Sequence, residues 1–192
     1  IFSGRGEKFT GPVEREIEAI VADPAWTAVE GPSAVQPPHD LTAEYLEHLL
    51  AVVPEAPVRQ AFAGVRLAVD CANGATSMLA PRLFARLGFA AVSTADRPDG
   101  RNINDGCGST HPEALARIVV ERGCRLGVAF DGDGDRAIFV DHRGRVVDGD
   151  AVLFLCARQM QREGRLRSGT VVATVMSNIG LELALGRLGI TL

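Results

Sequence analysis

The segment 127-GVAFDGDGDRAIFVD-141 places an acidic loop between two short apolar runs. Each run has the length and composition of a buried β-strand. The loop holds Arg136 and three aspartates that alternate with two glycines: Asp131, Asp133 and Asp135. A strand that leads directly into three negative charges predicts a sheet with a chemical site at the end of that strand.

Strand and helix patterns alternate in the sequence before this segment. Apolar runs predict strands at 65–69, 89–94 and 126–130, and helical patterns predict helices at 76–87 and 113–122. Such alternation is typical of a mainly parallel sheet covered by helices. A hairpin around Arg143-Gly144 adds strands at 137–141 and 145–147. We therefore predict an α/β domain with three α/β/α layers and a mixed, mainly parallel sheet.

The flanking segments are predicted to be helical, with a linker between two of the helices. Helices are expected at 12–22, 41–53 and 151–163, with Asp40 and either Asp148 or Asp150 as caps. Pro54 and Pro57 are expected to stop the second of these helices. Four prolines indicate a loop or linker over 23–39. Residues 170–192 show a further strand, a helix and the start of another strand. Because half a β-α-β unit cannot bury its own core, we expect the chain to be part of a longer protein.

Composition excludes several classes of protein. The net charge is -4 and the basic residues form no cluster, which disfavours a nucleic-acid-binding surface. No apolar run approaches the roughly 20 residues that a membrane span needs. No signal peptide is visible, and the four cysteines lack CxxC spacing, so we expect reduced thiols in a cytoplasmic protein.

The acidic loop has the composition of a magnesium site. In a straight strand, alternate carboxylates point to one face but lie about 6.6 Å apart at about 3.3 Å per residue. Because oxygen ligands bind Mg²⁺ at about 2.1 Å, the loop must curl, and Gly132 and Gly134 permit this. Arg136 is expected either to offset the negative charge or to bind an incoming phosphate.

Three other kinds of acidic loop share part of this pattern. An EF-hand requires Gly at position 6 and Glu at position 12 of its loop, where this chain has Arg136 and His142. A haloacid-dehalogenase-like phosphatase would use Asp131 as nucleophile and Asp133 as acid and base, but that similarity ends where Asp135 follows. A solvated acidic turn would place three like charges together without a cation, which costs energy.

Four stretches of the sequence together resemble the α-D-phosphohexomutases. They are FDGDGDR at 130–136, 69-VDCANGATSMLAPRLFARLG-88, 98-PDGRNINDGCGSTHPEAL-115 and 174-TVMSNIGLELALGRLGI-190. Within this family, the chain is most similar to the members that act on glucosamine phosphates. Phosphomannomutases and phosphoglucomutases often have a His-His-Pro-Asp-like segment where this chain has Asn102-Ile103-Asn104.

The resemblance implies a bacterial isomerase with four domains, in which a phosphoserine transfers its phosphoryl group to a hexose phosphate. A bisphosphate intermediate then returns the other phosphoryl group to the serine. Glucosamine 6-phosphate and glucosamine 1-phosphate would be interconverted, as in the synthesis of amino sugars and cell-wall precursors. The resemblance assigns Mg²⁺ to Asp131, Asp133 and Asp135, and places Arg136 near the phosphate.

The serine motif of the family, an Ala-Ser-His-Asn-Pro-like stretch, is absent from this sequence, so no catalytic nucleophile is assigned to it. By resemblance, residues 1–39 are the end of domain 1 and a linker, 40–165 are domain 2, and 166–192 begin domain 3. The other domains and a hexosamine phosphate are then the expected partners, while the oligomeric state stays open. The alternatives are another sugar specificity within the family, or a metal-binding structural domain that is inert by itself.

Other polar residues are assigned structural roles. The Asn73-Gly74 turn is expected to start a helix rather than to bind an anion. Ser177-Asn178 is interpreted as a helix cap, and His111 as part of a helix entry at Pro112.

Overall fold

The structure is a computed structural model that describes residues 2–27, 40–53 and 55–192. The chain divides into two compact units, residues 1–39 and 40–192. Most of the predicted 23–39 linker lies outside the described residues, as does Ile1.

The first unit contains one helix, α1 (Gly11–Ala22), within its described part. Pro12 lies in its first turn, where a missing N–H costs nothing. Phe2 and Lys8 form an isolated antiparallel bridge before the helix. No residue of α1 is buried among the described residues.

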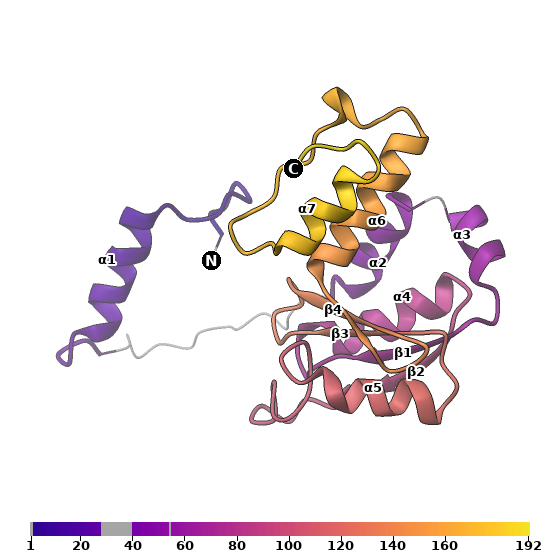
Figure 1. Ribbon diagram of the computed structural model, residues 1–192. Helices are drawn as coiled ribbons and strands as arrows, with labels where there is room; N and C mark the ends of the chain where they lie inside the picture. Colours follow the sequence, from indigo (N-terminus) through magenta and orange to yellow (C-terminus); the bar gives the residue numbers. More distant parts are fainter. Residues whose placement is uncertain (1, 28–39, 54) are drawn as a thin grey trace. The chain divides into compact units, whose positions relative to one another are not determined.

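The second unit is built on a five-stranded sheet in the order β2-β1-β3-β4-β5 (Figure 1). Its strands are β1 (Arg66–Asp70), β2 (Ala90–Thr94), β3 (Leu126–Phe130), β4 (Ala137–Asp141) and β5 (Val146–Val147). Strand β1 pairs in parallel with β2 and β3, whereas the β3–β4 and β4–β5 pairs are antiparallel. This arrangement confirms the predicted mixed, mainly parallel sheet.

Helices cover both faces of the sheet, because successive strand residues point to opposite sides. Leu67 and Val69 of β1 pack on the side of α4 (Ala80–Arg86), whereas Ala68 packs on the side of α5 (Pro112–Glu121). Figure 1 shows α4 and α5 on opposite faces. The predicted three-layer α/β/α architecture is therefore confirmed.

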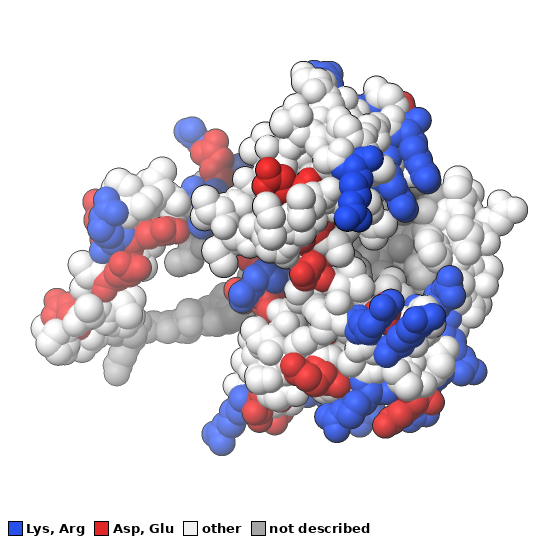
Figure 2. Space-filling view, viewed as in Figure 1, with Lys and Arg blue, Asp and Glu red and all other residues white. Residues whose placement is uncertain are grey.

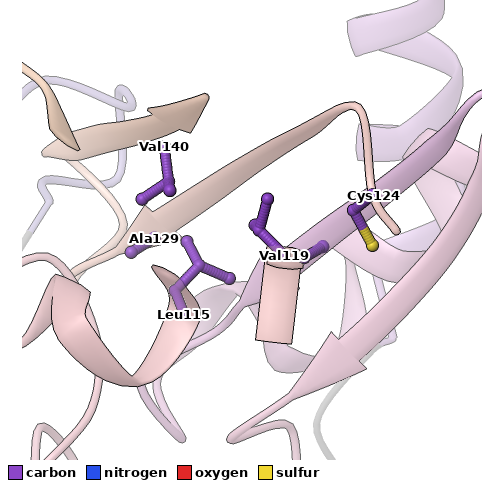
Figure 3. Close-up of a cluster of buried hydrophobic side chains, with 6 residues drawn as sticks. Leu115, Val119, Cys124, Ala129 and Val140 are labelled. Atoms are coloured by element: carbon purple, nitrogen blue, oxygen red, sulfur yellow. The ribbon is translucent and has the colours of Figure 1, made fainter. Parts of the chain in front are cut away.

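The core under α5 consists of small and branched side chains that fit closely together (Figure 3). Leu115 and Val119 of α5 are fully buried against Ala68, Ala129 and Val140 of the sheet, with Cys124 beside them. A Cβ atom on Gly127 of β3 would lie 2.6 Å from Val119 Cγ2. The glycine therefore lets the helix lie directly on β3.

The remaining helices form two further clusters. Helices α2 (Thr42–Ala51) and α3 (Glu55–Phe62) lie on the α4 side, where Leu46 and Leu50 of α2 pack with Leu87. Helices α6 (Gly149–Arg162) and α7 (Ile179–Gly186) pack on one another around buried Ala157, Leu181 and Leu185. Short 3₁₀ segments, Ala75–Met78 and Arg167–Gly169, precede α4 and α7.

Three local predictions are corrected by the structure. Pro54 and Pro57 were expected only to stop a helix; Pro54 lies outside the described residues, and Pro57 lies in the first turn of α3, where proline is tolerated. The predicted cap of α2 is confirmed in part: Leu41 occupies the N-cap position, but the Asp40 Oδ1 accepts the Thr42 N–H at 2.9 Å. The helix predicted at 76–87 is divided into a 3₁₀ turn and α4. The strand predicted from residue 170 is reduced to one bridge between Thr170 and Thr191.

All four cysteines are free, and only Cys156 is exposed. Burial raises the pKa of the Cys71 thiol to about 11, which keeps this thiol protonated and poorly reactive at neutral pH. In the part of the chain that the structure describes, no helix has both the length and the apolar character needed to cross a membrane.

We predict that Leu115→Ala lowers the free energy of unfolding by about 2–5 kcal/mol, because the substitution opens a cavity between α5 and the sheet. Val120→Ala on the same helix is the matched control. Val120 is 55% exposed, so its truncation is expected to change stability by less than about 0.5 kcal/mol. Urea unfolding of both variants measures the difference, and equal losses would contradict the packing described for α5.

Candidate functional site

Three loops meet at the carboxyl ends of β1 and β3, the edge at which open α/β sheets bind ligands. They are residues 71–75, 95–111 and 131–136. Backbone hydrogen bonds join the loops: the Ala75 N–H donates to the Gly132 carbonyl at 2.8 Å, and the Asn104 N–H to the Ala72 carbonyl at 2.9 Å. The acidic loop is therefore part of a larger, hydrogen-bonded assembly.

Asp70, the last residue of β1, forms hydrogen bonds to both of the first two loops. Its side chain is buried, and its Oδ1 and Oδ2 each accept a backbone N–H at 2.9 Å, from Ala72 and Gly108 respectively. Sequence analysis did not identify this residue. The available signal was a single carboxylate at the end of an otherwise apolar strand.

Glycines allow the loops to approach closely. A Cβ atom on Gly74 would collide with the backbone carbonyl of Gly132, and one on Gly108 would lie 2.7 Å from the Phe130 carbonyl oxygen. Gly134 has a φ of +76°, and a Cβ there would lie 2.6 Å from Thr76 Cγ2. These contacts leave no room for a larger residue at Gly74, Gly108 or Gly134 without a shift of the neighbouring atoms.

Asn73 organises the loops, and its turn with Gly74 leads into the 3₁₀ segment Ala75–Met78, as predicted. Its backbone is left-handed, with a φ of 48°, a conformation that asparagine tolerates better than most residues. Its side chain donates to the Asn102 carbonyl at 3.3 Å and accepts the Arg97 N–H at 3.1 Å.

Asp131 is the buried member of the acidic loop, with 4% of its surface exposed. Its Oδ1 accepts the backbone N–H groups of Gly134 and Arg136 at 3.0 and 3.1 Å. Its Oδ2 accepts Nε and Nη2 of Arg136, both at 2.9 Å. The loop therefore closes on its own first carboxylate.

The charge state of Asp131 follows from two opposing effects. Burial raises the pKa of its carboxyl group, whereas the hydrogen bonds and charge of Arg136 lower it. The second effect prevails and the pKa lies below its usual value, so the carboxylate is ionised at neutral pH.

The other two aspartates of the loop are directed to solvent. Asp133 is exposed, and the side chain of Asp135 is 75% exposed, with Oδ1 3.8 Å from Arg136 Nε. Across residues 2–27, 40–53 and 55–192, no group of three or more His, Cys, Asp or Glu side chains is placed to hold a metal ion. The structure thus brings the three aspartates into one loop, but it does not place all three carboxylates together as metal ligands.

The donor set of the loop nevertheless fits a hard divalent cation. Three ionisable carboxylates lie within five residues, and Gly132 and Gly134 between them give the backbone freedom to turn. Arg136 carries the positive charge that contacts Asp131 in this conformation. A cation bound at Asp131 would therefore compete with Arg136 for the same carboxylate.

Two predicted helix caps are confirmed outside this site. Asp148 accepts the Ala151 N–H at 3.0 Å at the start of α6, and Asn178 accepts the Gly180 N–H at 2.7 Å at the start of α7. Asp150 does not cap α6; its Oδ2 accepts the Asn178 N–H at 2.9 Å. His111 occupies the N-cap position of α5 without a side-chain cap bond.

Acidic and basic side chains both lie on the visible face of residues 40–192, and several basic side chains gather on its right-hand side (Figure 2).

Comparison with known families identifies the class of protein. Residues 43–144 match the family described as phosphoglucomutase/phosphomannomutase, alpha/beta/alpha domain II, and residues 148–192 match its alpha/beta/alpha domain III. The chain belongs to the phosphoglucomutase/phosphomannomutase family. The second match begins at the helix α6, which packs on α7.

The curated relatives point to one branch of this family. A phosphoglucosamine mutase of Pseudomonas aeruginosa is 48% identical over 191 residues, which are 98% of this chain and 42% of that protein. One from Ligilactobacillus salivarius is 45% identical over 188 residues, 96% of this chain and 41% of that protein. The chain therefore spans about two fifths of the length of the curated relatives it matches.

A solved structure shares the fold. The crystal structure of a phosphoglucomutase/phosphomannomutase family protein from Burkholderia thailandensis matches with a TM-score of 0.62 and 27% identity. The match covers 80% of this chain and 32% of that one.

We predict that Gly74→Ala destabilises the protein by about 1–3 kcal/mol, because the added methyl group meets the backbone of the acidic loop. Gly186→Ala in α7 is the matched control, since a Cβ there meets no atom within 4 Å and alanine favours a helix. Thermal unfolding should show a lower Tm for Gly74→Ala alone. A Tm for that variant equal to the wild-type value would contradict the close approach of the two loops.

Proposed function

We propose that this chain is the central part of a phosphoglucosamine mutase, which interconverts glucosamine 6-phosphate and glucosamine 1-phosphate in the cytoplasm. The observation that carries the proposal is the acidic loop at the carboxyl edge of the sheet, in a chain 48% identical to a phosphoglucosamine mutase over 98% of its length. The reaction would proceed through a phosphoserine and a bisphosphate intermediate.

Asp131, Asp133 and Asp135 would hold the Mg²⁺ ion in this proposal. The ion would supply charge neutralisation and Lewis acidity for phosphoryl transfer. Arg136 would bind a phosphate group, because a guanidinium presents several N–H donors in a planar fork. Its side chain is 71% exposed and therefore accessible to such a ligand.

The chain would contribute no nucleophile, since the 192 residues contain no Ala-Ser-His-Asn-Pro-like motif. Phosphoryl transfer through an enzyme intermediate requires an acceptor side chain. The proposal therefore assigns the phosphoserine to another segment of the same polypeptide. The hexosamine phosphate would bind between that segment and the loop described here.

We propose that residues 1–39 are the end of domain 1 with a linker, residues 40–165 are domain 2, and residues 166–192 begin domain 3. The division of the chain at residue 39 supports the first boundary. The packing of α6 on α7 and the domain III match from residue 148 favour moving the second boundary to the start of α6.

A second candidate function is a metal-binding structural domain that is inert by itself. The observation in its favour is the complete fold of the sheet unit, with buried cores on both faces. The two candidates differ in what a longer gene product does, so activity of that product separates them.

We predict that the full gene product converts glucosamine 6-phosphate to glucosamine 1-phosphate, and that the 192-residue chain does not. A coupled assay for glucosamine 1-phosphate measures both, with mannose 6-phosphate and glucose 6-phosphate as comparison substrates. Turnover by the 192-residue chain would contradict the assignment of the phosphoserine to another segment of the polypeptide. Faster turnover of a comparison substrate by the full product would assign another sugar specificity.

We further predict that Asp133→Asn in the full gene product weakens Mg²⁺ binding by roughly tenfold or more, because it removes one charged ligand. Asp105→Asn, an exposed aspartate in the neighbouring loop, is the control and is expected to bind Mg²⁺ as the wild type does. Isothermal titration calorimetry gives both affinities. An unchanged dissociation constant for Asp133→Asn would count against the metal loop.

A further inference from the structure

The carboxylate of Asp131 has no acceptor site left for a cation. A carboxylate offers about four lone-pair positions. Two on Oδ1 accept backbone N–H groups of the loop, and two on Oδ2 accept Nε and Nη2 of Arg136. Any ion that binds Asp131 must therefore displace a donor that is already there.

The guanidinium of Arg136 is the donor that is easiest to displace. The backbone N–H groups of Gly134 and Arg136 belong to the turn itself, and moving them would unfold the loop. The Arg136 side chain, in contrast, is 71% exposed, so it can leave Asp131 and be solvated by water. Ion pairs with an exposed partner are weak, whereas a buried carboxylate without a counter-charge is costly.

We propose that Arg136 is an exchangeable counter-ion of the acidic loop. It neutralises the buried Asp131 when no cation is present, and a divalent cation displaces it into solvent. This inference rests on the proposed function, because it takes the loop to be a cation site. It adds that metal binding is an exchange reaction, and that the exchange frees the donors of Arg136 for an anion.

Charge favours this exchange. With Arg136 as the only cation, the three carboxylates of the loop leave an excess of two negative charges. A divalent cation in addition to Arg136 brings the loop to neutrality, and Asp133 and Asp135 are exposed and free to turn toward it. The displaced guanidinium then remains near the loop without being needed to neutralise Asp131.

The next hairpin contains a matched arrangement without the acidic neighbours. Asp141 accepts the backbone N–H groups of Arg143 and Arg145 on Oδ1, and its Oδ2 accepts Arg145 Nε at 2.7 Å. The residues between Asp141 and Arg145 carry no carboxylate. Arg145 therefore serves as a control for the loss of an aspartate–arginine pair at a turn.

The test compares Mg²⁺ binding by the wild-type chain with that by Arg136→Gln and Arg145→Gln. Removing the competing guanidinium is expected to tighten binding about tenfold, which corresponds to about 1.4 kcal/mol. Arg145→Gln is expected to bind like the wild type. Weaker or unchanged binding by Arg136→Gln would overturn the exchange, since it would mean that the arginine supports the site or does not compete.

A second measurement needs no substitution and therefore does not depend on the folding of a variant. In protein labelled with ¹⁵N-arginine, the Nε–H resonance of Arg136 should shift on Mg²⁺ titration as its bond to Asp131 breaks, and that of Arg145 should not. A constant Arg136 resonance at saturating Mg²⁺ would overturn the exchange.

The two proposals can fail separately. If Asp133→Asn weakens Mg²⁺ binding but Arg136→Gln does not tighten it, the exchange alone is overturned. Protein whose Mg²⁺ binding is absent or insensitive to Asp133→Asn would overturn the metal loop, and with it the exchange.

Discussion

The close approach of the Gly74 and Gly132 backbones is the constraint on which the candidate site depends. Through the hydrogen bond from Ala75 to Gly132, the turn after β1 directly supports the acidic loop after β3. A side chain at Gly74 would collide with the Gly132 backbone, and one at Gly132 would meet the side chains of Ile103 and Asn104 in the 95–111 loop. The parallel pairing of β1 and β3 places both loops at one edge of the sheet, and the glycines then bring them into contact.

Burial and charge act in opposite directions at this edge. The sheet buries Asp70 and Asp131 at the ends of adjacent strands, which would be costly for unpaired carboxylates. Asp70 is satisfied by backbone N–H groups and Asp131 by backbone N–H groups together with a guanidinium. The first arrangement is permanent because the backbone cannot leave, whereas the second contains one mobile donor. A structural carboxylate and a candidate binding carboxylate thus lie at the carboxyl ends of two adjacent strands.

Much of the fold was predictable from sequence, because its strands are short apolar runs bounded by turns. The strands at 126–130 and 137–141 were predicted with the bounds that the structure gives them. The helix α3 was missed because Pro57 was interpreted as the end of the preceding helix. The sequence pattern alone does not distinguish a proline that ends one helix from a proline in the first turn of the next. The role of Asp70 depends on an N–H group 38 residues away, which no local pattern reveals. The Arg136 contact was expected only as one of two possibilities, because the sequence does not show whether this side chain turns back to its own loop or outward to a ligand.

The antiparallel pairing of β4 with β3 has a consequence for the kind of ligand this edge can attract. Where a parallel strand is followed by a helix, the helix start faces the loop and its dipole draws anions. Here Phe130 pairs directly with Ala137, so a hairpin takes the place of that helix behind the acidic loop. The charge of this segment is then set by its own side chains, and three carboxylates with one arginine leave an excess of two negative charges, which favours cations over anions.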